Sequence, residues 1–345
     1  MTSGDGYGHR GTGRRGVLRA GAAAVLLGAA GCSSGGKPGG ASTSSVAAPT
    51  TTPTAAPTPT PTRTPTATPT PLPSPPLWQP GPGEIQPDVK RRAVELVAAL
   101  GAWPPGGQGV EPGRARVAAL GLPPGLADQA GRLAPAAVEA SLEVIDAQYG
   151  GILADSASVL VVCRQWTRQP DGSVAPGGIT VDVRLSRAEP RWTVTALHPG
   201  DPGPAVSPAP AVAKVLAEPR IELPPEAEAD LLSGNVHDTV PTAMLRLAGP
   251  YTLSVSVVRT GHPLDVFGTT RPSDHPLGRA FDVRRIDGRA VVDPATPRQL
   301  IESFMRDAAA AGSYNVGGPV AIAGAGNQFF TDDTHHDHVH IGFNS

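Results

Sequence analysis

Near its C-terminus the chain reads Thr334-His335-His336-Asp337-His338-Val339-His340-Ile341-Gly342-Phe343. The apolar residues Val339, Ile341 and Phe343 occupy every second position, which is the period of a strand buried on one face. A strand here directs the side chains of His338 and His340 to the same face. Six of the nine histidines lie between positions 262 and 340, so this pair belongs to a wider cluster.

Another stretch of the same cluster reads Ser273-Asp274-His275-Pro276-Leu277-Gly278-Arg279-Ala280-Phe281-Asp282. A strand over 279–283 directs Asp282 toward a cavity, on the face opposite its apolar neighbours. His275, on the preceding loop, can fold back toward this carboxylate. The small residues Gly278 and Ala280 leave room for a metal ion between them.

Together the two stretches offer the ligands that zinc prefers. Zinc takes about four N, O or S ligands, and a catalytic zinc keeps one position for water, so two histidines and a carboxylate are a natural set. Asp337 adds a carboxylate that can accept a proton from that water. Taken alone, histidines 335–340 also fit a metal-scavenging tract at a chain end. The matching stretch around His275 favours a defined site.

These residues resemble the zinc D-alanyl-D-alanine carboxypeptidase family, which includes VanY-type carboxypeptidases and VanX-type dipeptidases and shares its fold with the hedgehog signalling domain. The family's first motif is matched by Ser273-x-His275-x-x-Gly278-x-Ala280-x-Asp282. The ending Asp337-His338-x-His340 matches the branch that uses aspartate as the base. The resemblance implies one zinc ion per chain, bound by His275, Asp282 and His340.

The resemblance also implies roles for the residues around these ligands. Asp337 would be the general base, His335 would help to stabilise the oxyanion, and His338 and Ser273 would support the site. Upstream, the family has Ser-Gly-Tyr-Arg, whose arginine engages the substrate. This chain has Ser256-Val257-Val258-Arg259 at that place, fourteen residues before Ser273. The resemblance therefore assigns the substrate role to Arg259, although Val257 and Val258 replace the Gly and Tyr of the pattern.

The resemblance covers residues 223–345 and implies an α+β domain with a small mixed antiparallel sheet. The implied activity is hydrolysis of D-amino-acid-containing peptides of peptidoglycan, as a carboxypeptidase or an endopeptidase. The altered residues around Arg259 favour an alternative, which is a non-catalytic, metal-containing lipoprotein that binds the cell wall. A third possibility is an extracytoplasmic metal-handling protein that uses the histidine cluster.

Residues 86–200 are predicted to form a smaller α+β domain with no assigned role. A helix is predicted from its N-cap Asp88 to Leu100, because the apolar residues between them recur at helical spacing, and another over 136–149. Strands with a period of two are predicted over 159–166, 179–185 and 192–196. A Pro-rich joint over 201–222 leads to the second domain.

Two elements of the second domain have clear sequence signals. Thr296-Pro297-Arg298-Gln299 is interpreted as a capping box with proline at the first helical position. The helix that follows has an apolar face and is predicted to end near Gly312. That face comprises Leu300, Ile301, Phe304, Met305 and Ala308. Residues 245–257 predict the end of a helix and then a strand that leads to the site.

Residues 1–32 are predicted to be an export signal. Arg14 and Arg15, followed by an apolar stretch, resemble a twin-arginine signal. Ala29-Ala30-Gly31-Cys32 resembles a lipobox, whose cysteine carries the lipid. Residues 33–85 are rich in Gly and Ser and then in Thr and Pro, which predicts a disordered linker. The expected location is outside the cytoplasm, anchored to the membrane through Cys32 and facing the cell wall, with secretion as the alternative.

The composition excludes several classes of function. Lys+Arg 28 against Asp+Glu 30 gives a net charge of −2, and without basic blocks the chain lacks the charge pattern of a nucleic-acid-binding protein. Two cysteines cannot form a dense disulfide framework, and Cys163 is predicted to be a buried thiol. The expected partners are peptidoglycan stem peptides and the membrane.

Overall fold

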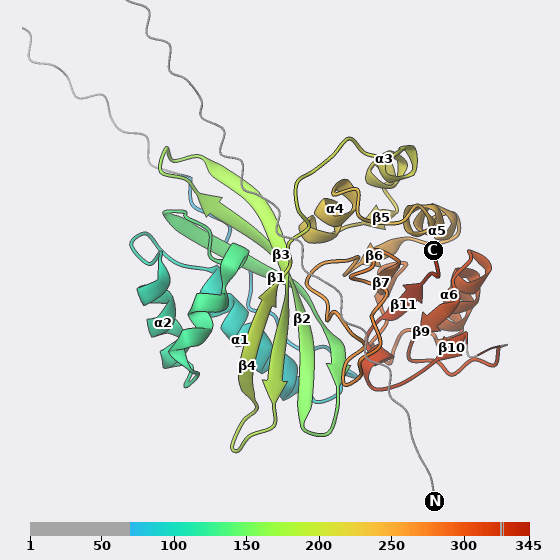
Figure 1. Ribbon diagram of the computed structural model, residues 1–345, viewed down its shortest axis with the longest axis horizontal. Coiled ribbons are helices and arrows are strands. Elements are labelled where there is room, and N and C mark those ends of the chain that lie inside the picture. Colours follow the sequence, from blue (N-terminus) through green and yellow to red (C-terminus); the bar gives the residue numbers. More distant parts are fainter. Residues whose placement is uncertain (1–69, 325, 327) are drawn as a thin grey trace, which may run out of the picture. The chain divides into compact units, whose positions relative to one another are not determined.

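The computed structural model describes residues 70–324, 326 and 328–345 (Figure 1). The twin arginine, Cys32 and most of the Thr/Pro-rich linker lie outside the described residues. The described chain is α+β and contains a four-stranded sheet and a seven-stranded sheet. No helix in this part of the chain is both long enough and apolar enough to cross a membrane.

Residues 84–200, called here the sheet domain, contain the four-stranded sheet. It is an antiparallel meander in the order β1-β2-β3-β4. Its strands are β1 (Glu139–Ile152), β2 (Ser156–Arg168), β3 (Val174–Ser186) and β4 (Thr193–Pro199). The helical elements are α1 (Pro87–Gly101), α2 (Val110–Ala119), η1 (Pro124–Gln129) and η2 (Gly131–Leu133). Helix α1 packs on one face of the sheet, and the two share one apolar core that includes the buried Cys163 (Figure 1).

The helix predicted from residue 88 is confirmed as α1, but its start is not capped as predicted. Its predicted apolar positions are all buried: Val89, Ala93, Leu96, Val97 and Leu100. The helix begins at Pro87, and Asp88 lies inside the first turn, where its carboxylate pairs with Arg91. Apolar periodicity therefore located the helix, whereas Pro87 determined its first residue.

The helix predicted over 136–149 is wrong, because this segment forms most of β1. Its Ala, Leu and Glu residues favour a helix in isolation, but pairing with β2 along the whole strand overrides that preference. Leu142 and Val144 pack into the core under α1, and Ile145 packs on the opposite face. A register shift between Val144 and Asp146 interrupts the period of two, so the sequence carries no regular strand pattern here.

Residues 201–345, called the C-terminal domain, contain the seven-stranded sheet in the order β10-β9-β11-β7-β6-β5, with β8 paired to β7. Its strands are β5 (Ile221–Glu222), β6 (Leu253–Val255), β7 (Ala280–Ile286), β8 (Arg289–Ala290), β9 (Asn315–Gly317), β10 (Phe329–Phe330) and β11 (Val339–Gly342). Its helices are α3 (Pro210–Ala217), α4 (Pro225–Leu232), α5 (Thr239–Leu247), α6 (Arg298–Ala310) and η3 (Thr334–His336). The expected joint over 201–222 thus includes a helix and an edge strand.

Helix α6 has the predicted apolar face but not the predicted capping box. Ile301, Phe304 and Met305 are buried in the core of the C-terminal domain. The residue at the N-cap is Pro297, and no side chain caps the helix. The Thr296 hydroxyl donates instead to the carbonyl oxygen of Ala290, because the preceding turn places that acceptor within reach.

The face of the four-stranded sheet opposite α1 contacts the C-terminal domain. Leu160 and Val162 of β2 pack with Val257, just after β6. Gly261 has a φ of 70°, and a Cβ there would lie 2.5 Å from the carbonyl oxygen of Thr180, so the close approach requires glycine. The sheet domain is therefore close enough to supply side chains to a site in the C-terminal domain.

A buried carboxylate lies at this contact and predicts a pH dependence of stability. Burial raises the pKa of Glu226 to about 7 from 4.5, and Arg132 of the sheet domain offsets only part of that effect. The folded protein therefore binds this proton more tightly than the unfolded chain does. Its free energy of unfolding should fall as pH rises from about 4.5 to about 7, by at most about 3 kcal/mol from this residue.

Urea unfolding of the Glu226→Gln variant between pH 4.5 and 8 measures this contribution. The difference in unfolding free energy between variant and parent should shift in favour of the variant as pH rises. The exposed Glu228 provides the matched control, since Glu228→Gln should follow the parent. Parallel profiles for the parent and Glu226→Gln would show that Glu226 does not titrate in this range.

Candidate metal centre

The pairing of β7 with β11 places two of the predicted ligands side by side. In this antiparallel pair His340 lies opposite Asp282. His275 reaches them from the preceding loop, which turns back where the Gly278 N–H donates to the His275 carbonyl oxygen at 2.8 Å. Gly278 has a φ of 71°, and a Cβ there would lie 2.1 Å from the carbonyl oxygen of Asn235. Glycine is therefore required for the turn that returns His275 to the strands.

The three predicted ligand atoms form a nearly equilateral triangle. Nε2 of His275 lies 3.1 Å from Oδ1 of Asp282 and 3.0 Å from Nδ1 of His340. The remaining distance, from Nδ1 of His340 to Oδ1 of Asp282, is 3.1 Å. Ligands about 2.0–2.2 Å from one zinc ion lie roughly 3–3.5 Å apart, so this triangle, called here the ligand triad, fits a single small metal ion.

Neighbouring groups orient the triad for metal binding. Nδ1 of His275 donates to the carbonyl oxygen of Val258 at 2.8 Å, which leaves Nε2 with its lone pair toward the triad. The second oxygen of Asp282 accepts a hydrogen bond of 2.7 Å from the side-chain amide of Gln148, in the sheet domain. Each of these two ligands therefore has an outer partner of the kind that fixes metal ligands in place.

The charges in the triad are also suited to a cation. Burial opposes ionisation of Asp282, but the imidazoles of His275 and His338 outweigh it and hold the carboxyl pKa well below its usual range. Burial lowers the pKa of His340 to about 4, because the nearby carboxylate of Asp282 offsets only part of the desolvation. At neutral pH the centre thus presents an ionised carboxylate and a neutral imidazole at His340, which are the forms that bind metal.

The triad lies at a cavity of about 880 Å³. Its wall includes His275 and His340 of the triad together with His262, His335 and His338. The ring of His262 stacks on that of His275, with centroids 4.2 Å apart and planes 18° apart. One ligand atom each of His262, His275 and Asp282 lies within 4.8 Å of the others, but His340 makes the shorter triangle.

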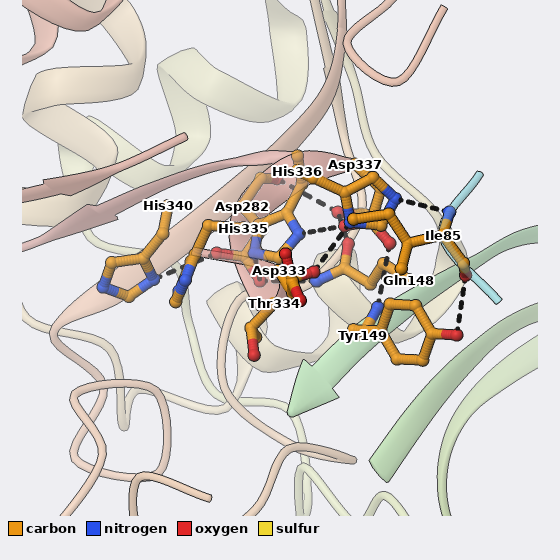
Figure 2. Close-up of polar contacts among 12 residues, drawn as sticks. Ile85, Gln148, Tyr149, Asp282, Asp333, Thr334, His335, His336, Asp337 and His340 are labelled. Atoms are coloured by element: carbon orange, nitrogen blue, oxygen red, sulfur yellow. Dashed lines mark hydrogen bonds and ion pairs between the residues drawn. The ribbon is translucent and has the colours of Figure 1, made fainter. Parts of the chain in front are cut away.

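The structure places Asp337 behind the wall of this cavity. It is only 5% exposed and does not line the cavity. Its Oδ2 accepts hydrogen bonds from the Lys90 ammonium at 2.6 Å and from the Tyr149 N–H at 3.0 Å. Its Oδ1 is 2.6 Å from Nδ1 of His338. Figure 2 shows Asp337 close to Tyr149 of the sheet domain.

Two histidines on the cavity wall are each paired with a carboxylate. Nδ1 of His338 is held by Asp337, and its Nε2 lies 3.8 Å from Oδ2 of Asp282. Burial disfavours the charged form of His338, but the carboxylates of Asp282 and Asp337 outweigh burial and raise its pKa to about 9. Nδ1 of His335 lies 2.7 Å from Oδ1 of Asp332, at the more open side of the site. Carboxylate pairing fixes the orientation of both rings.

Arg259 and Ser273 lie on different parts of the site. Arg259 does not line the cavity at the triad; its side chain lines a neighbouring cavity of about 650 Å³. Its guanidinium donates to the carbonyl oxygen of Pro202 at 3.4 Å and lies 3.9 Å from Asp230. Ser273 does line the cavity at the triad, where its hydroxyl is 3.4 Å from Nδ1 of His262. The structure thus places Ser273 at the cavity beside the triad and Arg259 at the neighbouring cavity.

A second group of metal-binding type, formed by Glu84, His336 and Asp337, already contains a cation. The ammonium of Lys90 contacts both Glu84 and Asp337 and is fully buried. The position that a metal ion would need is therefore taken by a side chain of the protein, and we assign no metal to this group.

Sequence reasoning did not identify the residues that the sheet domain contributes. Gln148 lies 134 positions from Asp282, and Lys90 lies 247 positions from Asp337. Neither belongs to a motif, and β1 itself was predicted as helix. The available signal is Lys90 itself, one of three lysines in the chain, which shares the buried face of α1 with Ala93 and Val94.

Comparison with models of known protein families, with curated proteins and with solved structures gave no match.

The geometry predicts one tight metal site that depends on the ligand triad. Replacing His275 or His340 by Ala should weaken zinc binding by more than about 100-fold, because the loss of a ligand exceeds the 10–100-fold typical of outer partners. Zinc competition with a chromophoric chelator measures the affinity, and a stoichiometry of one per chain is expected. Burial lowers the pKa of His275, but the carboxylate of Asp282 outweighs burial and raises it, so a proton competes with the metal ion for Nε2 and binding should weaken as pH falls.

The exposed His237 serves as the control, and His237→Ala should bind zinc like the parent. Equal zinc affinity in all three variants would place the metal elsewhere in the histidine cluster.

Proposed function

We propose that this protein is a zinc-dependent peptidase that hydrolyses D-amino-acid-containing peptides of peptidoglycan. The observation that carries the proposal is the buried ligand triad, with mutual distances of 3.0–3.1 Å, at a cavity whose wall carries two carboxylate-paired histidines. Two imidazole nitrogens and one carboxylate oxygen are a ligand set of catalytic zinc sites. The resemblance of both motifs to the zinc D-alanyl-D-alanine carboxypeptidase family supplies the substrate class.

Zinc at the triad would supply a Lewis acid for a peptide carbonyl and a water that is acidic near neutral pH. His275, Asp282 and His340 would hold it. The cavity of about 880 Å³ is large enough for a peptide of several residues, which suits either a carboxypeptidase or an endopeptidase.

We assign proton transfer to Asp337 and His338 acting as a pair. Asp337, the base by resemblance, has partners on both oxygens and lies behind His338. His338 is the member of the pair on the cavity wall. Asp337 fixes the orientation of His338 and, with Asp282, raises its pKa to about 9, so at neutral pH His338 carries a proton on Nε2 that it can donate to the leaving amine. The neutral His338 that results keeps its Nδ1 proton toward Asp337, and its Nε2 can take a proton from the next attacking water.

His335 and Arg259 are assigned to substrate contacts. His335 lies on the cavity wall, and Asp332 fixes its ring, so it can donate from Nε2 to the developing oxyanion. Arg259 faces the neighbouring cavity, which shares His262 and Phe267 with the cavity at the triad. Its proposed contact is with a more distant part of the peptide.

The proposed location is the outer face of the membrane, with a lipid on Cys32 and the linker extending toward the cell wall. This location rests on the sequence signals in the first 85 residues and fits a substrate in the wall. The alternative proposal is a non-catalytic, metal-containing protein that binds the wall. The engagement of Asp337 by Lys90, and the direction of Arg259 away from the triad, favour that alternative.

Incubation of the purified protein with defined muropeptides, followed by mass spectrometry, tests this proposal. Zinc-dependent loss of one terminal alanine would indicate a carboxypeptidase, and separation of a cross-linked dimer an endopeptidase. Asp337→Asn and His338→Gln should each lower kcat/KM by at least about 100-fold, the usual contribution of a general acid–base group. His237→Gln is the control and should retain full activity.

Two results would contradict the proposal. If the zinc-loaded protein cleaves no muropeptide but binds wall fragments, the wall-binding alternative is correct. If Asp337→Asn and His338→Gln both retain full zinc-dependent activity, the protein is a peptidase but the proton is carried by another group.

A further inference from the structure

Two buried side chains of the sheet domain reach the metal centre of the C-terminal domain. Gln148 on β1 is 1% exposed and contacts Asp282 of the triad. Lys90 on α1 is 0% exposed and contacts Asp337. Burying an ammonium and a carboxamide this completely is costly unless each is fully partnered, so both are committed to these contacts.

The amide of Gln148 has a defined orientation. Its oxygen accepts a hydrogen bond from the Ser256 hydroxyl, and its nitrogen donates to Oδ2 of Asp282 at 2.7 Å. The reverse orientation would place the amide oxygen against a carboxylate oxygen, where neither has a hydrogen to donate. Ser256 therefore fixes Gln148, and Gln148 fixes the carboxylate.

The contact acts on the oxygen of Asp282 that is not in the triad. Oδ1 lies 3.1 Å from both imidazole ligand atoms, whereas Oδ2 accepts from Gln148. A carboxylate held at one oxygen cannot rotate freely about its Cβ–Cγ bond, so Oδ1 stays directed at the other two ligands. Such an outer hydrogen bond typically changes metal affinity by about 10–100-fold.

The next residue of β1 holds the other carboxylate of the centre. The Tyr149 N–H donates to Oδ2 of Asp337 at 3.0 Å, beside the Lys90 ammonium. A register shift between Tyr149 and Gly151 interrupts the pairing of β1 with β2 at this point. Strand irregularities of this kind redirect backbone and side-chain groups next to functional sites. Figure 2 shows Gln148 and Tyr149 beside Asp282 and Asp337.

We infer that the sheet domain is a fixed part of the metal centre, in which Gln148 is a positioning residue that sets metal affinity through Asp282. This inference rests on the proposed metal site and extends it to a domain to which the sequence assigned no role. According to this inference the sheet domain is not a separate wall-binding module, because the ligand triad depends on Gln148, which this domain supplies.

The test compares two buried glutamines of the same sheet domain. Gln148→Leu removes the donor to Asp282. Gln165→Leu removes hydrogen bonds to the carbonyl oxygens of Gly101 and Leu133, at a site that contacts no predicted ligand. Both variants should lower the free energy of unfolding of the metal-free protein, measured with urea in the presence of a chelator. Only Gln148→Leu should weaken zinc binding, by about 10–100-fold in a chelator competition.

A second variant covers the case in which Gln148→Leu does not fold. Ser256→Ala leaves Gln148 in place but removes the hydroxyl that orients its amide. Zinc affinity should fall in this variant too, by less than in Gln148→Leu. The full chain is used throughout, so that the domain contact is intact.

The outcomes separate this inference from the proposed function. If the parent binds zinc and cleaves muropeptides while Gln148→Leu and Ser256→Ala bind zinc with the parent's affinity, the peptidase proposal stands and Gln148 has only a structural role. If Gln165→Leu weakens zinc binding as much as Gln148→Leu does, the effect is a general one of stability and the inference is wrong. If the parent itself binds no zinc, the metal site and the inference both fail.

Discussion

The carboxylate of Asp282 is fully buried, and a buried carboxylate requires partners on both of its oxygens. In this protein those partners come from three separate places. His275, from a loop, and His340, from the adjacent strand, contact Oδ1. Gln148, from the other domain, donates a hydrogen bond to Oδ2. The arrangement of the C-terminal domain, and its contact with the sheet domain, follow from this requirement.

The same requirement recurs at Asp337, the second buried carboxylate of the site. Burial would otherwise favour its neutral form, but Lys90 and His338 hold the pKa of its carboxyl below the usual range. Lys90 is buried only because Glu84 and Asp337 share its charge. Removing one member of such a group leaves an uncompensated charge, which typically costs about 3–5 kcal/mol. Stability and site geometry therefore depend on the same contacts.

Local periodicity predicted much of the fold and part of the site. The apolar faces of α1 and α6 were predicted, because each depends on which side of one helix is buried. The alternation of residue types also located β7 and β11, although residues 280–283 and 339–342 are buried on both faces. Three features that failed depend on neighbours instead. Asp88 does not cap α1 but pairs with Arg91 inside the first turn. Residues 136–149 became a strand through pairing with β2, and Thr296 turned to Ala290 rather than to the helix end.

The sequence by itself determined which residues could bind a metal ion: the spacing around His275 and Asp282, and the alternation around His340, depend only on residue type and the geometry of a strand. Tertiary structure alone decided how these residues are used. It set the register that places His340 opposite Asp282, directed Arg259 into the neighbouring cavity, and brought Gln148 and Lys90 to the centre. The physical reason is that a buried polar group is satisfied by whichever donor the packing of distant segments brings within about 3 Å, and sequence spacing does not encode that distance.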